Sequence, residues 1–178
     1  THEWFLYCPY SIDKKIFNYE NVKIINVSIS TKFIGFHIVF SQIFIPILSL
    51  INRVDMLWFP ANRSSLFLPK SIAQVLSIHD VVWKKYPETM KYTRLKLEKF
   101  FMMRSAELAD IVTTVSNSSF DDIVRGGVSD SNKTIVVSNG VNRPTLIEKK
   151  IEKSFFLFVG TLEPRKNLTR LLQAYNSL

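Results

Sequence analysis

Short apolar runs alternate with segments of helical spacing through the middle of this chain, and this alternation restricts the fold more than any other feature. The apolar runs cover residues 55–59, 75–78, 111–115 and 134–138. Runs of this kind are typical of parallel strands that are buried on both faces. Since helices are expected between the runs, the sequence predicts an α/β fold with a doubly wound parallel sheet and right-handed crossovers, Rossmann-like in class.

Two of the expected helices have local signals. One spans residues 92–109, and three apolar residues mark one face of it: Leu97, Phe101 and Leu108. A shorter helix follows Ser116, whose hydroxyl is suited to cap its first turn, and stops at Gly126 and Gly127. We therefore expect both helices to connect neighbouring strands of the sheet.

The most hydrophobic stretch of the chain covers residues 33–51, after two short expected strands at 4–7 and 22–27. Its length would suffice to cross a bilayer, and Arg53 would then flank the span. Polar side chains within the stretch and a central proline, Pro46, argue against a span. We favour a helix that starts or is interrupted near Pro46, with most apolar side chains buried against the sheet and one face available to a membrane.

The formal net charge of +8 suggests an anionic partner. Nucleic acid is disfavoured, because the basic residues are scattered and no nucleic-acid-binding motif is present. An anionic membrane surface or the phosphates of a nucleotide fit better. The single cysteine, Cys8, excludes an internal disulfide framework. No His, Asp or Glu cluster has metal-ligand spacing, so neither a metal nor another cofactor is expected.

The last quarter of the chain has the pattern of one more strand and helix. Residues 155–159 are an unbroken apolar run that predicts a parallel strand buried on both faces, and Gly160 ends it. A helix is expected from residue 168, with Asn167 placed to cap it. Arg165 and Lys166 then lie just before a helix N-terminus, which attracts anions. They indicate either a diphosphate cradle or a solvated loop with two surface charges.

Four segments resemble, in order and spacing, motifs of the group 1 glycosyltransferases (glycosyltransferase family four, GT-B fold). The segments are Ile78-His79-Asp80, Ile111 to Ser119, Ile135 to Asn142 and Gly160 to Leu168. The resemblance implies a retaining enzyme that moves a sugar from a nucleotide diphosphate donor to a glycan or lipid-linked acceptor in polysaccharide biosynthesis. It implies a cytoplasmic protein, and contact with the inner face of the membrane would be peripheral.

The resemblance also implies a division of the chain into parts of two domains. Residues 1–141 would form the acceptor-side Rossmann-like domain without its first strand, residues 142–153 the linker, and residues 154–178 the first strand–helix unit of the donor domain. The family's Gly-rich loop and its ExxxxxxxE donor motif are absent from the sequence. We therefore expect a fragment with an incomplete fold that is inactive alone.

His79 and Asp80 follow an expected strand, at the sheet edge where open α/β folds bind ligands. A histidine there can donate to a sugar hydroxyl or shuttle a proton, and a structural His–Asp pair that fixes the loop is the alternative. The resemblance implies that His79 faces the donor sugar. Retaining enzymes of this class need no protein nucleophile, because the leaving diphosphate assists attack. The resemblance therefore gives Lys166, with Arg165 and Gly160, the role of binding the diphosphate and stabilising its charge.

Four further residues are candidates for sugar or acceptor contacts: Asp80, Ser116, Asn139 and Gly140. Helix capping explains Ser116 equally well, and a plain turn with φ > 0 explains Asn139-Gly140. Trp58 and Trp83 could stack on sugars or pack in the core. Two other classes of function stay open at this point. One is a non-catalytic nucleotide- or sugar-binding module, and the other is a membrane-associated structural protein.

Overall fold

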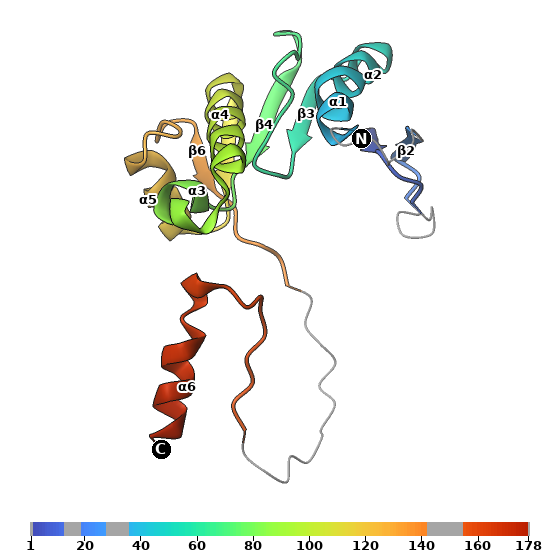
Figure 1. The fold of residues 1–178 in the computed structure, drawn as a ribbon. Helices are drawn as coiled ribbons and strands as arrows, with labels where there is room; N and C mark the ends of the chain where they lie inside the picture. Colours follow the sequence, from blue (N-terminus) through green and yellow to red (C-terminus); the bar gives the residue numbers. More distant parts are fainter. Residues whose placement is uncertain (1, 13–18, 28–35, 142–154, 178) are drawn as a thin grey trace.

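The computed structural model describes residues 2–12, 19–27, 36–141 and 155–177, and its strands form two parallel sheets (Figure 1). The smaller sheet pairs β1 (Trp4–Cys8) with β2 (Val22–Asn26). The larger sheet contains, in this order, β3 (Met56–Phe59), β4 (Ala73–Ser77), β5 (Ile111–Thr114) and β6 (Thr134–Val136). The predicted α/β fold with parallel strands is confirmed, as an incomplete Rossmann-like fold. The linker expected at 142–153 lies outside the described residues.

The core lies on the face of the larger sheet that the helices α4 (Tyr92–Leu108) and α5 (Asn117–Arg125) cover. The largest fully buried apolar side chains are Leu76 of β4, Ile78 just after it, Val112 of β5, Met102 of α4 and Ile123 of α5. Burial of each stabilises the fold by roughly 1.5–3 kcal/mol. The short helices α3 (Val82–Lys85) and η3 (Pro87–Thr89) connect β4 to α4.

The opposite face of the larger sheet is exposed in the described part of the chain. The pairing register places Trp58, Val75 and Ile111 in one row across three strands. Trp58 is 57% exposed and Ile111 is 41% exposed. Because the strands follow one another in sequence order, right-handed crossovers place the connecting helices on the same face. One-sided covering is therefore a consequence of the topology.

Helix α4 has the predicted length but buries a different face. Its buried residues are Met102, Ser105 and Ala106, whereas Leu97 is 51% and Leu108 38% exposed. Small residues on the buried face let the chain approach closely, and the Ser105 hydroxyl accepts a hydrogen bond from the Ser64 N–H at 2.9 Å. The face marked by the larger apolar residues is therefore not the face that packs in the core.

Helix α5 begins and ends as the sequence predicts. The Ser116 hydroxyl caps it by accepting a hydrogen bond from the Ser119 N–H at 3.1 Å. At its end Gly127 has a positive φ of 64°, which favours glycine. At Gly126, a Cβ would lie 2.3 Å from the Asp122 carbonyl oxygen. Larger residues at these two positions would disturb the helix end.

The hydrophobic stretch forms a continuous helical segment from residue 36, and residues 33–35 lie outside the described part. The segment comprises α1 (Phe36–Val39), the π-helical η2 (Phe40–Phe44) and α2 (Ile45–Ile51). Pro46 lies in the first turn of α2, so the expected start of a helix near it is confirmed, whereas the backbone stays helical through this point. No helix among the described residues is long and apolar enough to cross a membrane.

The expected burial of this helical segment is wrong for five of its apolar side chains. Exposed are Ile38, Ile43, Ile47, Leu50 and Ile51. The inward side instead uses polar contacts: the Gln42 amide donates to the Ser64 carbonyl at 3.0 Å and accepts from the Leu66 N–H at 2.7 Å. Ser49 is also fully buried. Polar inward residues leave the aliphatic side chains on the outside.

The C-terminal segment contains the expected helix but not the expected strand. Residues 155–159 have no strand pairing, and Phe156 and Leu157 are each 76% exposed. A strand needs a neighbour to pair its backbone N–H and C=O groups, and none lies beside this run in the described chain. After η4 (Pro164–Lys166), α6 (Leu168–Asn176) begins where predicted. Asn167 occupies the cap position in a left-handed conformation, but its side chain makes no capping bond.

Candidate functional site

His79 lies at the carboxyl edge of the larger sheet, as the sequence predicts. β4 ends at Ser77, and the Ile78 N–H still donates to the Thr113 carbonyl of β5 at 2.8 Å. The next residue, His79, is therefore the first to leave the sheet, and its side chain is exposed. This is the edge at which open parallel sheets bind ligands.

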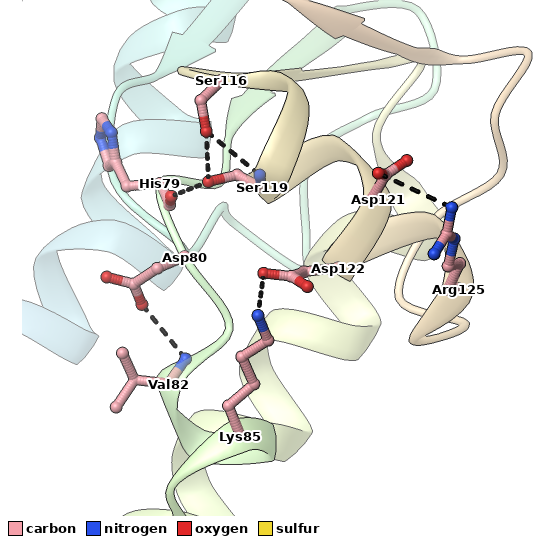
Figure 2. Close-up of polar contacts among 9 residues, drawn as sticks. All are labelled: His79, Asp80, Val82, Lys85, Ser116, Ser119, Asp121, Asp122 and Arg125. Carbon is pink, nitrogen blue, oxygen red and sulfur yellow. Dashed lines mark hydrogen bonds and ion pairs between the residues drawn. The ribbon is translucent and has the colours of Figure 1, made fainter. Parts of the chain in front are cut away.

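Three hydrogen bonds hold His79 in place. Its N–H donates to the Asn62 side-chain oxygen at 2.9 Å, and its ring Nε2 lies 2.8 Å from the Pro60 carbonyl oxygen. Its carbonyl accepts from the Ser119 hydroxyl at 3.0 Å (Figure 2). The backbone on both sides of the residue and the ring itself are thus fixed by the loop after β3 and by the first turn of α5.

Asp80 and Ser116 have local structural partners at this edge. The Asp80 carboxylate accepts a hydrogen bond from the Val82 N–H at 3.3 Å, at the start of α3 (Figure 2). No hydrogen bond joins its side chain to His79 in the described chain, so the structure contains no His–Asp pair. The Ser116 hydroxyl donates to the Ser119 hydroxyl at 3.1 Å besides capping α5. Its position next to the His79 anchor is a consequence of capping.

One ion pair and one hydrogen bond stabilise the loop that follows His79 by tying α3 to α5. Lys85 Nζ lies 2.6 Å from the Asp122 carboxylate (Figure 2). Lys84 Nζ donates to the Gly126 carbonyl at the end of α5. The Lys85–Asp122 pair is partly exposed, so it contributes at most about 1 kcal/mol. The effect of the two contacts is to keep the segment after Asp80 against the helix that anchors His79.

Asn139 and Gly140 follow β6 but do not form the predicted turn. Both are exposed, and neither has a positive φ. β6 ends at Val136, after which the Val137 N–H still donates to the Thr114 carbonyl at 2.7 Å. The chain then continues without a reversal, so the left-handed conformation that an Asn-Gly turn requires is not needed.

The two cations of the C-terminal segment differ in their partners. Arg165 Nε lies 2.5 Å from the Glu163 carboxylate, which also accepts from the Thr161 hydroxyl at 2.9 Å. The Lys166 ammonium has no hydrogen bond or ion pair with any described residue. Arg165 must share its guanidinium with a carboxylate, whereas Lys166 is available to an anion. The hydrogen bond from Arg165, and then that from Thr161, lowers the pKa of Glu163.

The described residues form two separate groups of candidates. His79, Asp80 and Ser116 lie together, joined through Ser119 (Figure 2). Gly160, Arg165 and Lys166 lie in the exposed C-terminal segment, and no hydrogen bond or ion pair in the described chain connects the two groups. The described residues contain no group of three His, Cys, Asp or Glu side chains placed to hold a metal ion.

Trp58 and Trp83, the two tryptophans that could stack on sugars, differ in burial. Trp83 is buried, with its indole N–H 2.9 Å from the Met102 sulfur, whereas Trp58 is exposed and donates to the Ser77 hydroxyl at 2.9 Å.

A partly open cavity of about 180 Å³ contains none of the predicted site residues. It is lined by His37, Ile38, Ser41, Gln42, Arg63 and Phe101.

Two anchors of His79, Asn62 and Ser119, are absent from the sequence-based candidates. They lie 17 and 40 positions from His79 along the chain. One signal could have found Asn62. It is a polar residue just after the strand that ends at Phe59, and the carboxyl ends of parallel strands meet at one edge.

Two curated proteins are similar to part of this chain. Over 95 residues the chain is 32% identical to the O-antigen chain mannosyltransferase RfbU of Salmonella typhimurium. This alignment covers 53% of the chain and 26% of that relative. Over 127 residues the chain is 28% identical to the O-antigen chain mannosyltransferase B of Escherichia coli. This second alignment covers 64% of the chain and 33% of that relative. The chain thus spans only about a quarter to a third of these relatives' length. No protein-family model and no solved structure matches it.

Proposed function

We propose that this chain is part of a retaining glycosyltransferase of group 1 that transfers mannose from a nucleotide diphosphate donor to a growing, lipid-linked glycan. The similarity to two O-antigen chain mannosyltransferases is the observation that carries the proposal. The parallel sheet with His79 at its carboxyl edge supports it, because this fold binds nucleotides and sugars at that edge.

In the proposed reaction Lys166 stabilises the leaving diphosphate. Breaking the glycosyl–phosphate bond develops negative charge on the diphosphate, and a fixed cation there lowers the barrier without a metal. Lys166 suits this role because its ammonium forms no hydrogen bond or ion pair with any described residue. Arg165 is a second contact that Glu163 restrains. Gly160 would lie beside the phosphates, His79 beside the donor sugar, and Asp80, Ser116, Asn139 and Gly140 near the sugar or acceptor.

The proposed activity is tested in the full-length protein with a nucleotide diphosphate mannose donor. Lys166→Ala should reduce turnover by about 10²–10³-fold and weaken donor binding, because the diphosphate is charged before and during bond breaking. Lys99→Ala is the matched control and should leave turnover unchanged, since Lys99 is an exposed lysine of α4 that forms no ion pair with a described residue. Unaltered kinetics of Lys166→Ala would place the diphosphate elsewhere. Donor binding without transfer in the wild type would favour a non-catalytic sugar-binding module.

We also propose a domain arrangement and a location. Residues 142–153 would link an acceptor-side domain, 1–141, to a donor domain that begins at 154–178. A lipid-linked acceptor would hold the enzyme at the cytoplasmic face of the membrane in peripheral contact. Two observations support that contact: four exposed aliphatic side chains follow helical spacing along one face, and the sequence from Asn21 to Val54 contains no Asp or Glu. The four are Ile43, Ile47, Leu50 and Ile51.

Vesicle sedimentation tests the membrane contact. Full-length protein should bind phosphatidylglycerol vesicles more strongly than phosphatidylcholine vesicles, and Ile47→Glu should weaken that binding at least about tenfold. Leu97→Glu on α4 is the control, since Leu97 is 51% exposed and Ile47 50%. Equal losses in both variants would mean that the helix face between residues 43 and 51 is not the contact.

A further inference from the structure

One of the three bonds around His79 involves its ring and determines which ring nitrogen carries the hydrogen. Ring Nε2 lies 2.8 Å from the Pro60 carbonyl oxygen, and a carbonyl oxygen can only accept a hydrogen bond. Nε2 must therefore carry the hydrogen and donate. In a neutral imidazole only one nitrogen is protonated, so Nδ1 has a lone pair and is an acceptor. No described residue forms a hydrogen bond with Nδ1.

The backbone contacts determine where this ring is held. Asn62 Oδ1 accepts from the His79 N–H at 2.9 Å, only two residues after Pro60, whose carbonyl binds the ring. The loop after β3 therefore forms hydrogen bonds with both the backbone and the side chain of His79. On the other side, the Ser119 hydroxyl donates to the His79 carbonyl at 3.0 Å. By holding the His79 backbone, Asn62 keeps the His79 ring next to the Pro60 carbonyl, which orients the ring.

We propose that Asn62 is a positioning residue that, with the Pro60 carbonyl, holds His79 with hydrogen on Nε2 and presents Nδ1 as an acceptor to a hydroxyl of the donor sugar. His79 would then receive a hydrogen bond from the sugar in its neutral form. This differs from the donor role that its residue type first indicated. The sugar contact rests on the proposed glycosyltransferase function, whereas the ring tautomer and the role of Asn62 in fixing it do not.

The tautomer is tested by long-range ¹H–¹⁵N spectra of full-length protein labelled with ¹⁵N-histidine, at a pH where the ring is neutral. His79 signals are assigned from a His79→Gln sample. We expect a protonated Nε2 and an unprotonated Nδ1. Asn62→Ala should give a mixture of both tautomers, and Asn62→Asp, which keeps an acceptor for the His79 N–H, should restore the single form. A protonated Nδ1 in the wild type, or an unchanged Asn62→Ala spectrum, would overturn the proposal.

Kinetics of the same variants test the consequence for transfer. Asn62→Ala should lower kcat about tenfold and leave KM for the donor within about twofold, because misplacing one contact group affects the reacting geometry more than overall binding. Asn62→Asp should recover most of kcat. Asn132→Ala should match the wild type, because Asn132 is exposed and its side chain makes no hydrogen bond with the described part of the chain. An Asn62→Ala enzyme with wild-type kcat would overturn the positioning role. A wild type that transfers no sugar would instead remove the proposed function, while the spectra still decide the tautomer.

Discussion

β4 and the segment 155–159 look alike in sequence, but only β4 is a strand. The segment 155–159 is the more apolar of the two, yet Phe156 is 76% exposed whereas Leu76 of β4 is fully buried. β4 has β3 on one side and β5 on the other, so its backbone groups are paired at both edges. An apolar run therefore shows that a segment is suited to burial, but neighbouring strands decide whether it becomes a strand.

The helices beside these two segments, α5 and α6, both form although only α5 is packed in the core. α5 packs Ile123 into the core, whereas α6 leaves Leu171, Leu172 and Tyr175 between 50% and 61% exposed. Both are helical nevertheless. Helical hydrogen bonds are formed within the segment itself, so a helix does not require a partner to satisfy its backbone. Local sequence therefore predicts helices correctly in both regions, but it predicts strands correctly only in the packed one.

Replacing one leucine in each region tests whether the larger sheet is packed and the C-terminal segment is not. Leu76→Ala should lower the free energy of unfolding by about 2–5 kcal/mol, because it leaves a cavity in the core. Leu171→Ala should change it by less than about 0.5 kcal/mol, since Leu171 is 50% exposed. Urea unfolding followed by circular dichroism measures both. Similar losses in the two variants would mean that α6 packs against other parts of the protein.

The sequence predicted the four strands β3 to β6 and their parallel direction because strand and helix periods are local signals. It did not identify the buried face of α4, where Met102 rather than Leu97 faces the core. That choice depends on which elements pack against the helix, and small residues such as Ser105 and Ala106 give a weak signal. The outward aliphatic residues of α2 were mispredicted for the same reason, since buried Gln42 and Ser49 occupy the inner side.

The candidate site was predictable only in part. The position of His79 follows from the end of β4, which local pattern predicts. Its anchors, Asn62 and Ser119, could not be derived from spacing, because hydrogen bonds across 17 and 40 positions depend on how the strands are ordered in the sheet. The Glu163–Arg165 pair lies within three residues, yet the sequence alone did not separate the paired Arg165 from the unpaired Lys166.

The two cap positions give a second, smaller test of the same comparison. Ser116→Ala should destabilise the protein by about 1 kcal/mol, because the cap bond to the Ser119 N–H and the contact with the His79 anchor are lost. Asn167→Gly should change stability by no more than a few tenths of a kcal/mol. Its side chain makes no cap bond, and its φ of 51° suits glycine. Thermal unfolding measures both, and a larger loss for Asn167→Gly would reveal a contact of the asparagine side chain.

The smallest expected effect concerns Glu163, where only contacts within the exposed segment act. Its pKa is lowered mainly by the hydrogen bond from Arg165 and then by that from Thr161. A lowered carboxyl pKa means that the local turn is stabilised above the unfolded-state pKa and loses that stabilisation as the pH falls through the folded-state pKa. Titration of the Glu163 carboxyl by NMR should therefore show a midpoint below that of an ordinary glutamate.

Substitutions of the two partners make this titration decisive. Arg165→Gln should raise the Glu163 midpoint more than Thr161→Ala, because the Arg165 bond is the larger cause of the lowered pKa. High salt should reduce the shift in the wild type, since an exposed pair is screened by ions. A wild-type midpoint at the ordinary glutamate value would show that the pair is not populated in solution. Arg165 would then be as available to a diphosphate as Lys166, and the distinction between the two cations would disappear.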